Sequence, residues 1–312
     1  MKQLSLSHGY SIPSLCKLVG YTKQAYYKHA LSVEEASARN EIVLQAILEI
    51  RAEMPSLAGD KVHQLLKKRL PKELVPGRDA TYSLMRTHGL IRPRKSLRIR
   101  TTITVYKMEY HDLIKGLSIE RPNQVWVADI TYIRLSTGEF IYLALVTDYY
   151  SRKIVGWDLS ASLSLDGALA ALKMALSTLP PGVIPTHHSD RGCQYYSKVY
   201  TELLKKLGMP ISMYTDGDPR NNAVAERING TVKNEMLEGY TLGSLEEALA
   251  VLPERIRIYN MVRPHRSLDF LTPEEAYHMS GPIKRRWSTY YKTEGKKEKI
   301  MNEEVVDMKE NV

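Results

Sequence analysis

The feature that most constrains the fold is the order of apolar runs and amphipathic segments after Gln124. Three closely spaced runs rich in β-branched and aromatic residues, at 124–135, 140–147 and 153–159, predict an antiparallel meander. Helical and strand-like patterns then alternate. Helices are expected at 165–179, 198–207 and 223–237, and strands at 183–188 and 210–214. This order predicts an α/β domain built on a mixed five-stranded sheet.

The residues before this domain predict small helices. Residues 11–30 form two short amphipathic segments around Gly20, with Ser11 and Thr22 as N-caps. This is the spacing of a helix-turn-helix, whose second helix contacts DNA. The candidate contacts on that helix are Lys23, Gln24, Tyr27 and Lys28. A helical hairpin without a role in DNA binding has the same pattern, so both interpretations stay open. Helices at 40–53, 61–70 and 80–88 predict a second helical unit.

The positive charge of the chain is concentrated in this N-terminal part. The 312 residues contain 44 Lys and Arg against 35 Asp and Glu, a net charge of +9, and residues 1–120 carry all of the excess. A proline-broken segment at 91–100 could follow a phosphate backbone. Its basic residues are Arg92, Arg94, Lys95, Arg98 and Arg100. The distribution favours a part that binds a polyanion next to a neutral part with another task, although a basic linker that serves solubility is the alternative.

Other features exclude whole classes of protein. No run of 18 uncharged apolar residues is present, so we expect no transmembrane helix and no membrane partner. The N-terminus lacks the apolar core of a secretory signal. Cys16 and Cys193 cannot form a disulfide framework, which favours a reducing compartment. The histidines and cysteines show no zinc-site spacing.

Three carboxylates suggest chemistry in the neutral part. Asp129 lies within the first apolar strand, where an aspartate is costly unless it is paired or holds a metal. Asp190 ends the next short strand, and Glu226 lies in the first turn of a helix. Carboxylates from three elements are typical of a two-magnesium site for phosphoryl transfer. Taken alone, each of them is better explained by an ordinary structural role, as a salt bridge for Asp129, a turn for Asp190 and an acidic helix start for Glu226.

The spacing and the surrounding motifs point to a family. Thirty-five residues separate Asp190 from Glu226, and the local sequences are VWVADITYI, HSDRGCQY, NNAVAERINGTVKNE and YNMVRPHRSL. Over residues 10–280 the chain resembles the OrfB-type DDE transposases of the third insertion-sequence family, whose core is similar to that of retroviral integrases. The resemblance implies a ribonuclease-H-like core, a catalytic and metal-binding triad of Asp129, Asp190 and Glu226, and a DNA contact at Lys233. It also implies two Mg²⁺ ions per site, for which Mn²⁺ substitutes.

The resemblance further implies nicking at the 3′ ends of an insertion sequence, followed by strand transfer. The partners implied are DNA, as terminal inverted repeats and target, a homo-oligomer of at least two chains, and a protein of the upstream reading frame. The location implied is the bacterial cytoplasm, at the nucleoid. Two alternatives remain: a ribonuclease-H-fold nuclease that does not join strands, and a non-catalytic DNA-binding regulator. The helical DNA-reading units disfavour the first, and the three carboxylates disfavour the second.

These observations divide the chain into five parts. The expected ranges are an N-terminal helix-turn-helix at 1–38, a second helical DNA-binding domain at 39–90, a basic linker at 91–120, the catalytic core with a helical extension at 121–280, and a charged, partly disordered tail at 281–312. Two motifs lie late in the core. Arg263 and His265 either stabilise the fold or face DNA, and residues 272–275 (TPEE) form a capping box.

Overall fold

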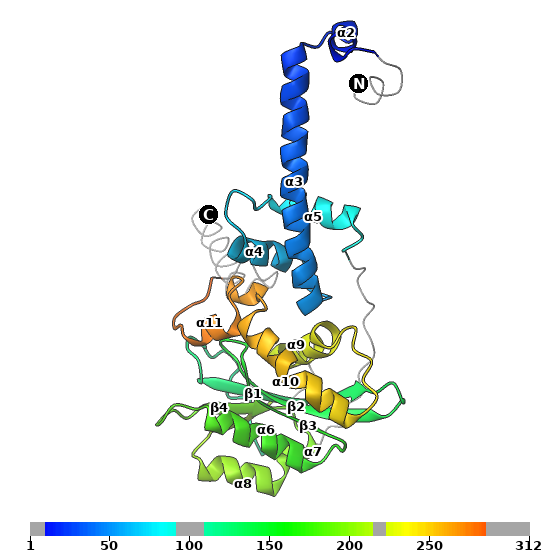
Figure 1. Ribbon diagram of the computed structural model, residues 1–312. Coiled ribbons are helices and arrows are strands. Elements are labelled where there is room, and N and C mark those ends of the chain that lie inside the picture. The colour runs from blue at the N-terminus through cyan, green and yellow to red at the C-terminus, as the bar shows by residue number, and fades with distance from the viewer. Residues whose placement is uncertain (1–9, 92–108, 215–222, 285–312) are drawn as a thin grey trace, which may run out of the picture.

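The computed structural model describes residues 10–91, 109–214 and 223–284, which form a helical N-terminal part and an α/β core (Figure 1). The core contains the mixed five-stranded sheet that the sequence predicts. Its strands are β1 (Val125–Arg134), β2 (Phe140–Asp148), β3 (Ile154–Ser160), β4 (Thr186–Ser189) and β5 (Ile211–Met213). They lie in the order β3-β2-β1-β4-β5, with β1, β2 and β3 antiparallel and with β4 parallel to both β1 and β5. This is the ribonuclease-H-like order.

The strand β4 is shorter than expected. We predicted a strand at 183–188, but β4 begins only at Thr186. Pro185 precedes it and has no backbone N–H to donate to a neighbouring strand, so the ladder starts after the proline. The four residues of β4 pair with β1 only over Val125–Ala128.

Helices cover both faces of the sheet because side chains alternate along β1. Trp126 and Ala128 pack in one cluster with helix α6 (Leu165–Ser177) and helix α8 (Lys198–Lys206), while Val125 and Val127 contact Ala225 of helix α9 (Ala223–Thr231). A short helix, α7 (Cys193–Tyr196), precedes α8. Gly156 lets α6 lie directly on β3, since a Cβ there would lie 2.1 Å from the carbonyl oxygen of Ala171.

The helical part consists of α2 (Ile12–Leu18), α3 (Lys23–Glu53), α4 (Gly59–Arg69) and α5 (Arg78–Thr87). The expected N-caps are present, because Ser11 accepts a hydrogen bond from the backbone of Ser14, and Thr22 from that of Ala25. The expected break between helices in residues 31–39 is wrong: α3 is one helix of 31 residues. That stretch contains neither glycine nor proline and is rich in alanine and glutamate, so nothing in it stops a helix. The N-terminal half of α3 projects away from the core (Figure 1).

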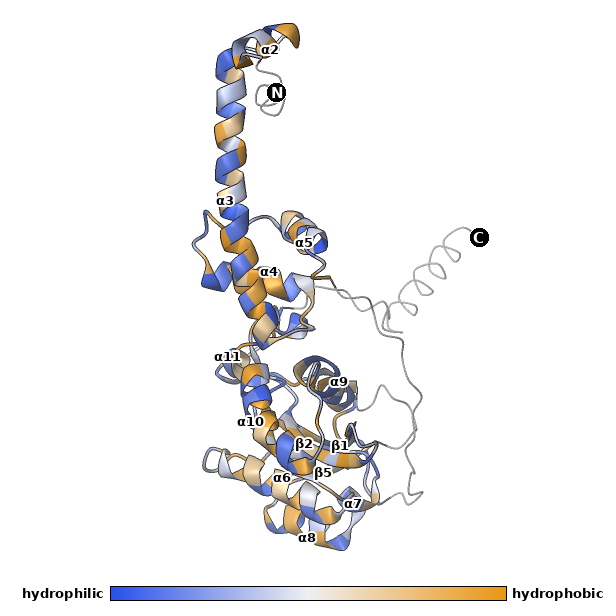
Figure 2. Ribbon diagram, turned by 45° about the vertical axis from the view of Figure 1, so that its right-hand side comes forward, coloured by the Kyte–Doolittle hydropathy of each residue, from blue (hydrophilic) through white to orange (hydrophobic). Residues whose placement is uncertain are grey.

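The C-terminal half of α3 packs with the core. One apolar cluster joins Ile47 of α3 and Leu66 of α4 to Ile133 of β1 and Leu252 of helix α10 (Leu245–Met261). Figure 2 shows the apolar residues along this half of α3 and on α4. Arg255 of α10 also donates to the carbonyl oxygen of Glu53, at 2.8 Å. The second helical unit and the core therefore share one hydrophobic core.

The last elements carry local features that matter for the site. The helix expected at 223–237 consists of α9 followed by a π-helical segment, η2 (Val232–Met236). A 3₁₀ turn, η3 (Arg266–Leu268), and helix α11 (Pro273–Tyr277) close the described chain, and α11 begins with the predicted capping box of Thr272 and Glu275. In the part of the chain that the structure describes, no helix has the length and apolarity needed to span a membrane.

Candidate active site

Asp129 lies in the middle of β1, on the side of the sheet that α9 covers. Its Oδ1 accepts a hydrogen bond from the backbone N–H of Ile130 at 2.9 Å. Its Oδ2 accepts one from Nδ2 of Asn229 at 2.8 Å. Asn229 is 5% exposed and lies on α9, three residues after Glu226. This hydrogen bond holds α9 against Asp129. Residues three apart lie on the same side of a helix, so Glu226 also lies on the side of α9 that faces Asp129.

Asp190 and Glu226 come from neighbouring elements. Asp190 directly follows β4, the parallel neighbour of β1, and its Oδ1 accepts from the backbone N–H of Gly192 at 2.9 Å. A Cβ at residue 192 would lie 2.9 Å from that oxygen, so glycine allows the turn to close around the carboxylate. Glu226 lies in the first turn of α9 and is exposed. The expected positions of all three acids, within a strand, after a strand and at a helix start, are confirmed.

The electrostatics couple the three carboxylates. Burial, together with the negative charges of Asp190 and Glu226, raises the pKa of Asp129 from 3.8 to about 8. Burial also raises the pKa of Asp190. A divalent cation would offset this repulsion, and carboxylate oxygens are the ligands that hard cations prefer. In addition, Oδ1 of Asn229 is buried without a hydrogen-bond partner, so an acceptor remains for the hydration shell of an ion.

The donor types and charges therefore fit a divalent metal. Among residues 10–91, 109–214 and 223–284, however, no three His, Cys, Asp or Glu side chains are grouped as ligands of one ion. The three carboxylates lie on the expected elements, and their role as the metal-binding triad stays a prediction.

Replacing Asp129 by asparagine tests this electrostatic description. The raised pKa means that the folded protein favours the protonated carboxyl, so ionisation destabilises the fold as the pH rises from the unfolded value of 3.8 towards about 8. Asp129→Asn is therefore expected to raise the melting temperature of the metal-free protein at about pH 8 and to change it little at about pH 4. Added Mg²⁺ should stabilise the wild type more than the variant. If the wild type and Asp129→Asn had equal melting temperatures at about pH 4 and also at about pH 8, the proposed repulsion would be contradicted.

Lys233 lies on η2 and reaches the edge of the sheet. Its ammonium lies 4.2 Å from the ring centroid of Tyr132 on β1, and burial lowers its pKa. Its expected contact with DNA stays a prediction.

The remaining candidate DNA contacts lie in the N-terminal part. The side chains of Lys23, Gln24, Tyr27 and Lys28 are all exposed on the first turns of α3, as a recognition helix requires. The basic residues Arg92, Arg94, Lys95, Arg98 and Arg100 fall outside the residues that the structure describes.

The motif around Arg263 stabilises the fold. Arg263 is 4% exposed and donates to both carboxylate oxygens of Glu235 on η2, at 3.0 and 2.6 Å. Its Nη1 lies 2.8 Å from Nε2 of His265, whose pKa burial and the charge of Arg263 hold well below the ordinary value. Lys61 of α4 lies 3.8 Å from the same glutamate. Of the two roles considered for this motif, the structure favours stabilisation over contact with DNA.

The arrangement also contains a residue that the sequence analysis did not single out. Asn229 donates a hydrogen bond to Asp129. The one sequence feature that pointed to this residue is its spacing of three residues from Glu226 within NNAVAERING.

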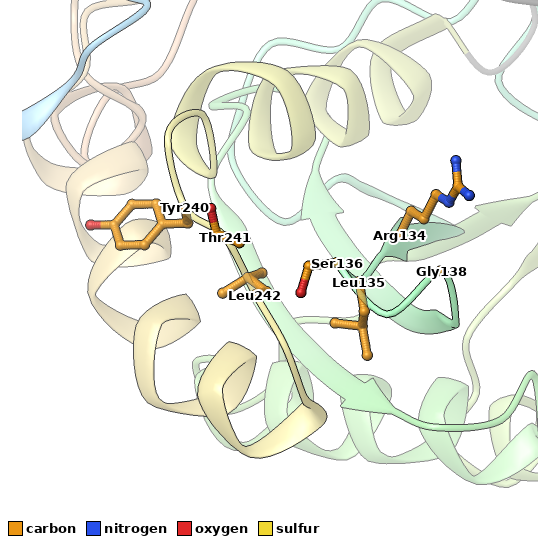
Figure 3. Close-up of a pocket in the computed structure, with 7 residues that line it drawn as sticks. All are labelled: Arg134, Leu135, Ser136, Gly138, Tyr240, Thr241 and Leu242. Atoms are coloured by element: carbon orange, nitrogen blue, oxygen red, sulfur yellow. The ribbon is translucent and has the colours of Figure 1, made fainter.

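A separate pocket of about 370 Å³ lies at the far end of β1, between the β1–β2 hairpin and residues 240–242 (Figure 3). Arg134 and Tyr240 line it, and the three carboxylates do not.

Comparisons with known proteins bear on both halves of the chain. Two family profiles described as integrase core domain match residues 119–219 and 207–273. The chain is 30% identical over 279 residues to a transposase for insertion sequence element IS629 of Shigella sonnei, covering 87% of this chain and 93% of that protein. It is 31% identical to a 31 kDa protein of insertion element IS600 from the same organism, covering 85% and 98%. Among solved structures, the HTLV-2 integrase catalytic core domain in complex with magnesium matches 51% of this chain and 98% of that chain, with 18% identity and a TM-score of 0.41.

Proposed function

The chain belongs to the third family of insertion-sequence transposases, which carry an integrase core domain. We propose that it acts as the transposase of its element, cutting and joining DNA at the ends of that element. The proposed reaction nicks the 3′ ends of the element at its terminal inverted repeats and then joins each freed 3′-hydroxyl to target DNA. Asp129, Asp190 and Glu226 form the active site.

The observation that carries this proposal is the repulsion around Asp129. A buried carboxyl whose pKa is raised to about 8 by burial and two neighbouring acids favours a cation at the site. We propose that the three carboxylates hold two Mg²⁺ ions, or Mn²⁺ in their place. Bound there, such ions would supply activation of the attacking oxygen and stabilisation of the leaving 3′-oxygen in an in-line displacement.

The other residues of the site act on the carboxylates and on the DNA. Asn229 holds Oδ2 of Asp129 through a hydrogen bond, so that carboxylate keeps one orientation. The ammonium of Lys233, at the edge of β1, binds a phosphate near the cut. The exposed side chains at the start of α3 contact bases of the inverted repeat.

Strand transfer by the purified full chain tests the function. The substrate is linear DNA that ends in the termini of the element, mixed with a plasmid target. We expect cut and joined products with Mg²⁺ or Mn²⁺ and none with a chelator. Cutting without any joining would instead support the nuclease alternative, and DNA binding without either product would support the regulator.

The basic linker provides a second test. Changing Arg94, Lys95 and Arg98 together to glutamine should weaken binding of the terminal DNA and lower the slope of log affinity against log salt by about 3, roughly one per lost phosphate contact. Fluorescence anisotropy over a salt series measures this slope. The matched control changes the exposed Lys173, Lys198 and Lys206 on α6 and α8 of the core to glutamine, which removes the same charge outside the proposed DNA-binding units. An unchanged slope in the linker variant would make the segment a solubility feature.

The organisation of the chain is also part of the proposal. Residues 1–38 and 39–90 bind DNA as two units joined by the continuous helix α3, residues 91–120 link them to the catalytic core at 121–280, and residues 281–312 form a charged tail. Because one site performs both cutting and joining, two DNA ends must be held together, which requires at least a dimer. A protein of the upstream reading frame completes the assembly, and it works at the nucleoid of the bacterial cytoplasm.

A further inference from the structure

One face of the β1–β2 hairpin gathers aromatic and basic side chains. Residues directly opposite in a strand pair lie on the same face, as do residues two apart in a strand. In the register, Tyr132 is opposite Tyr142, and Arg134 is opposite Phe140, so all four share one face. We call these four residues, together with Lys233, the hairpin face.

The rings of the hairpin face remain accessible although they contact one another. Tyr132 and Phe140 pack edge to face with centroids 5.4 Å apart, yet they are 44% and 46% exposed. Lys233 reaches over the edge of β1 onto the ring of Tyr132, at 4.2 Å. In Figure 3 the guanidinium of Arg134 points away from the strand, and its side chain is exposed. Exposed rings beside two cations form a surface suited to flat, anionic ligands.

The hairpin face lies on the two elements that carry the carboxylates. Tyr132 follows Asp129 by three residues on β1, about 10 Å at roughly 3.3 Å per residue, and its side chain points to the opposite face of the sheet. Lys233 follows Glu226 on the continuous helix of α9 and η2. Since β4 pairs with β1 only as far as Ala128, β1 runs past the end of β4 from Asp129 to Arg134. A strand of DNA with a phosphate at the carboxylates would have to pass over this unpaired edge of β1, beside Lys233, to reach the hairpin face, a path of about three nucleotides at roughly 3.4 Å each.

We propose that the hairpin face binds unpaired nucleotides next to the reacting phosphate, with a base stacked on Tyr132 and Phe140 and phosphates bound by Lys233 and Arg134. This rests on the proposed function, because that function places the phosphate at the carboxylates. The occupant is single-stranded, since the base faces in a duplex are covered by their neighbours and cannot stack on a protein ring. Stacking tolerates any base, so the hairpin face separates strands without reading sequence.

The test measures stacking directly and does not depend on catalysis. The probe is a duplex with a single-stranded thymidine overhang that contains one 2-aminopurine, whose fluorescence is quenched when it stacks. We expect the full wild-type chain to quench the probe, and Tyr132→Ala combined with Phe140→Ala to weaken overhang binding about tenfold or more. Tyr132→Phe should bind as the wild type does, because it keeps the ring. Ultraviolet cross-linking should join the overhang to the β1–β2 hairpin.

Controls separate this inference from the proposed function. Tyr240→Ala removes another exposed tyrosine with a cation near its ring, Arg255 at 5.4 Å, and should leave quenching unchanged. Glu226→Gln should abolish joining yet still quench the probe, so a failure of the catalytic assignment would leave this measurement standing. Circular dichroism verifies that the alanine variant is folded. Undiminished quenching by the folded alanine variant, or equal competition by a blunt duplex, would overturn the proposal.

Discussion

Glu226→Gln is expected to bind terminal DNA with the affinity of the wild type while losing metal-dependent strand transfer by about 10³-fold or more. The amide keeps the shape of the side chain but removes its charge and one metal-binding oxygen. Metal stabilisation of a phosphoryl-transfer transition state is worth several kcal/mol, and each 1.36 kcal/mol corresponds to about tenfold in rate. Initial rates of joining at saturating Mg²⁺, together with DNA binding by anisotropy, measure both parts of this expectation.

The position of Glu226 makes the variant a clean test. The side chain is exposed in the first turn of α9, so its loss should change the free energy of unfolding by no more than about 0.5 kcal/mol. Glu202→Gln is the matched control, because Glu202 is an exposed glutamate on α8, on the opposite face of the sheet, and should join strands at the wild-type rate. Joining by Glu226→Gln at the rate of this control would remove Glu226 from the active site.

Arg263→Met should produce the largest loss of stability, about 3–5 kcal/mol in the free energy of unfolding. Methionine keeps the apolar volume but removes both hydrogen bonds to Glu235. Burial alone would raise the pKa of Glu235, and the charges of Arg263 and Lys61 hold it below the ordinary value. Without the arginine, a largely buried carboxylate retains only the ammonium of Lys61, at 3.8 Å, and the weaker influence of the charge of Arg51. Urea unfolding of the metal-free protein measures this loss.

The chain offers a matched control for the buried pair. Arg257 donates two hydrogen bonds to Glu254 in the same bidentate way, but the two side chains are 56% and 50% exposed. Arg257→Met should therefore cost at most about 1 kcal/mol. If the two methionine variants unfold at the same urea concentration, the network around Glu235 does not stabilise the contact between α4, η2 and the end of α10.

The order of the strands and the positions of the three acids could be predicted because they depend on local pattern. Apolar runs rich in β-branched and aromatic residues mark β1 and β2, and Glu226 lies where the pattern changes to helical periodicity. The spacing of the motifs then allowed Asp129, Asp190 and Glu226, which lie far apart in the chain, to be assigned to one expected site. No pattern within one element shows that Asn229 touches Asp129, since 100 residues separate them and only the packing of α9 on the sheet joins them.

Two differences from the expected helices, the length of α3 and the π-helical turn after α9, also have physical causes. We expected α3 to end near residue 30 because the N-terminal segment matched a compact helix-turn-helix, yet the absence of a stop signal lets the helix continue to Glu53. The π-helical turn after α9 coincides with the insertion of Glu235 between Arg263 and Lys61. Partners from α4 and from the end of α10 define that environment, so it is visible only after the chain has folded.

The most direct test of the central claim is the location of metal ions in the DNA-bound protein. A crystal structure of the full chain with terminal DNA and Mn²⁺, using anomalous scattering, shows each ion independently of any assumed chemistry. We predict two peaks about 4 Å apart, held by the carboxylates of Asp129, Asp190 and Glu226 beside the reacting phosphate. Ions bound elsewhere, or Glu226 directed into solvent while DNA occupies the site, would contradict the proposed active site.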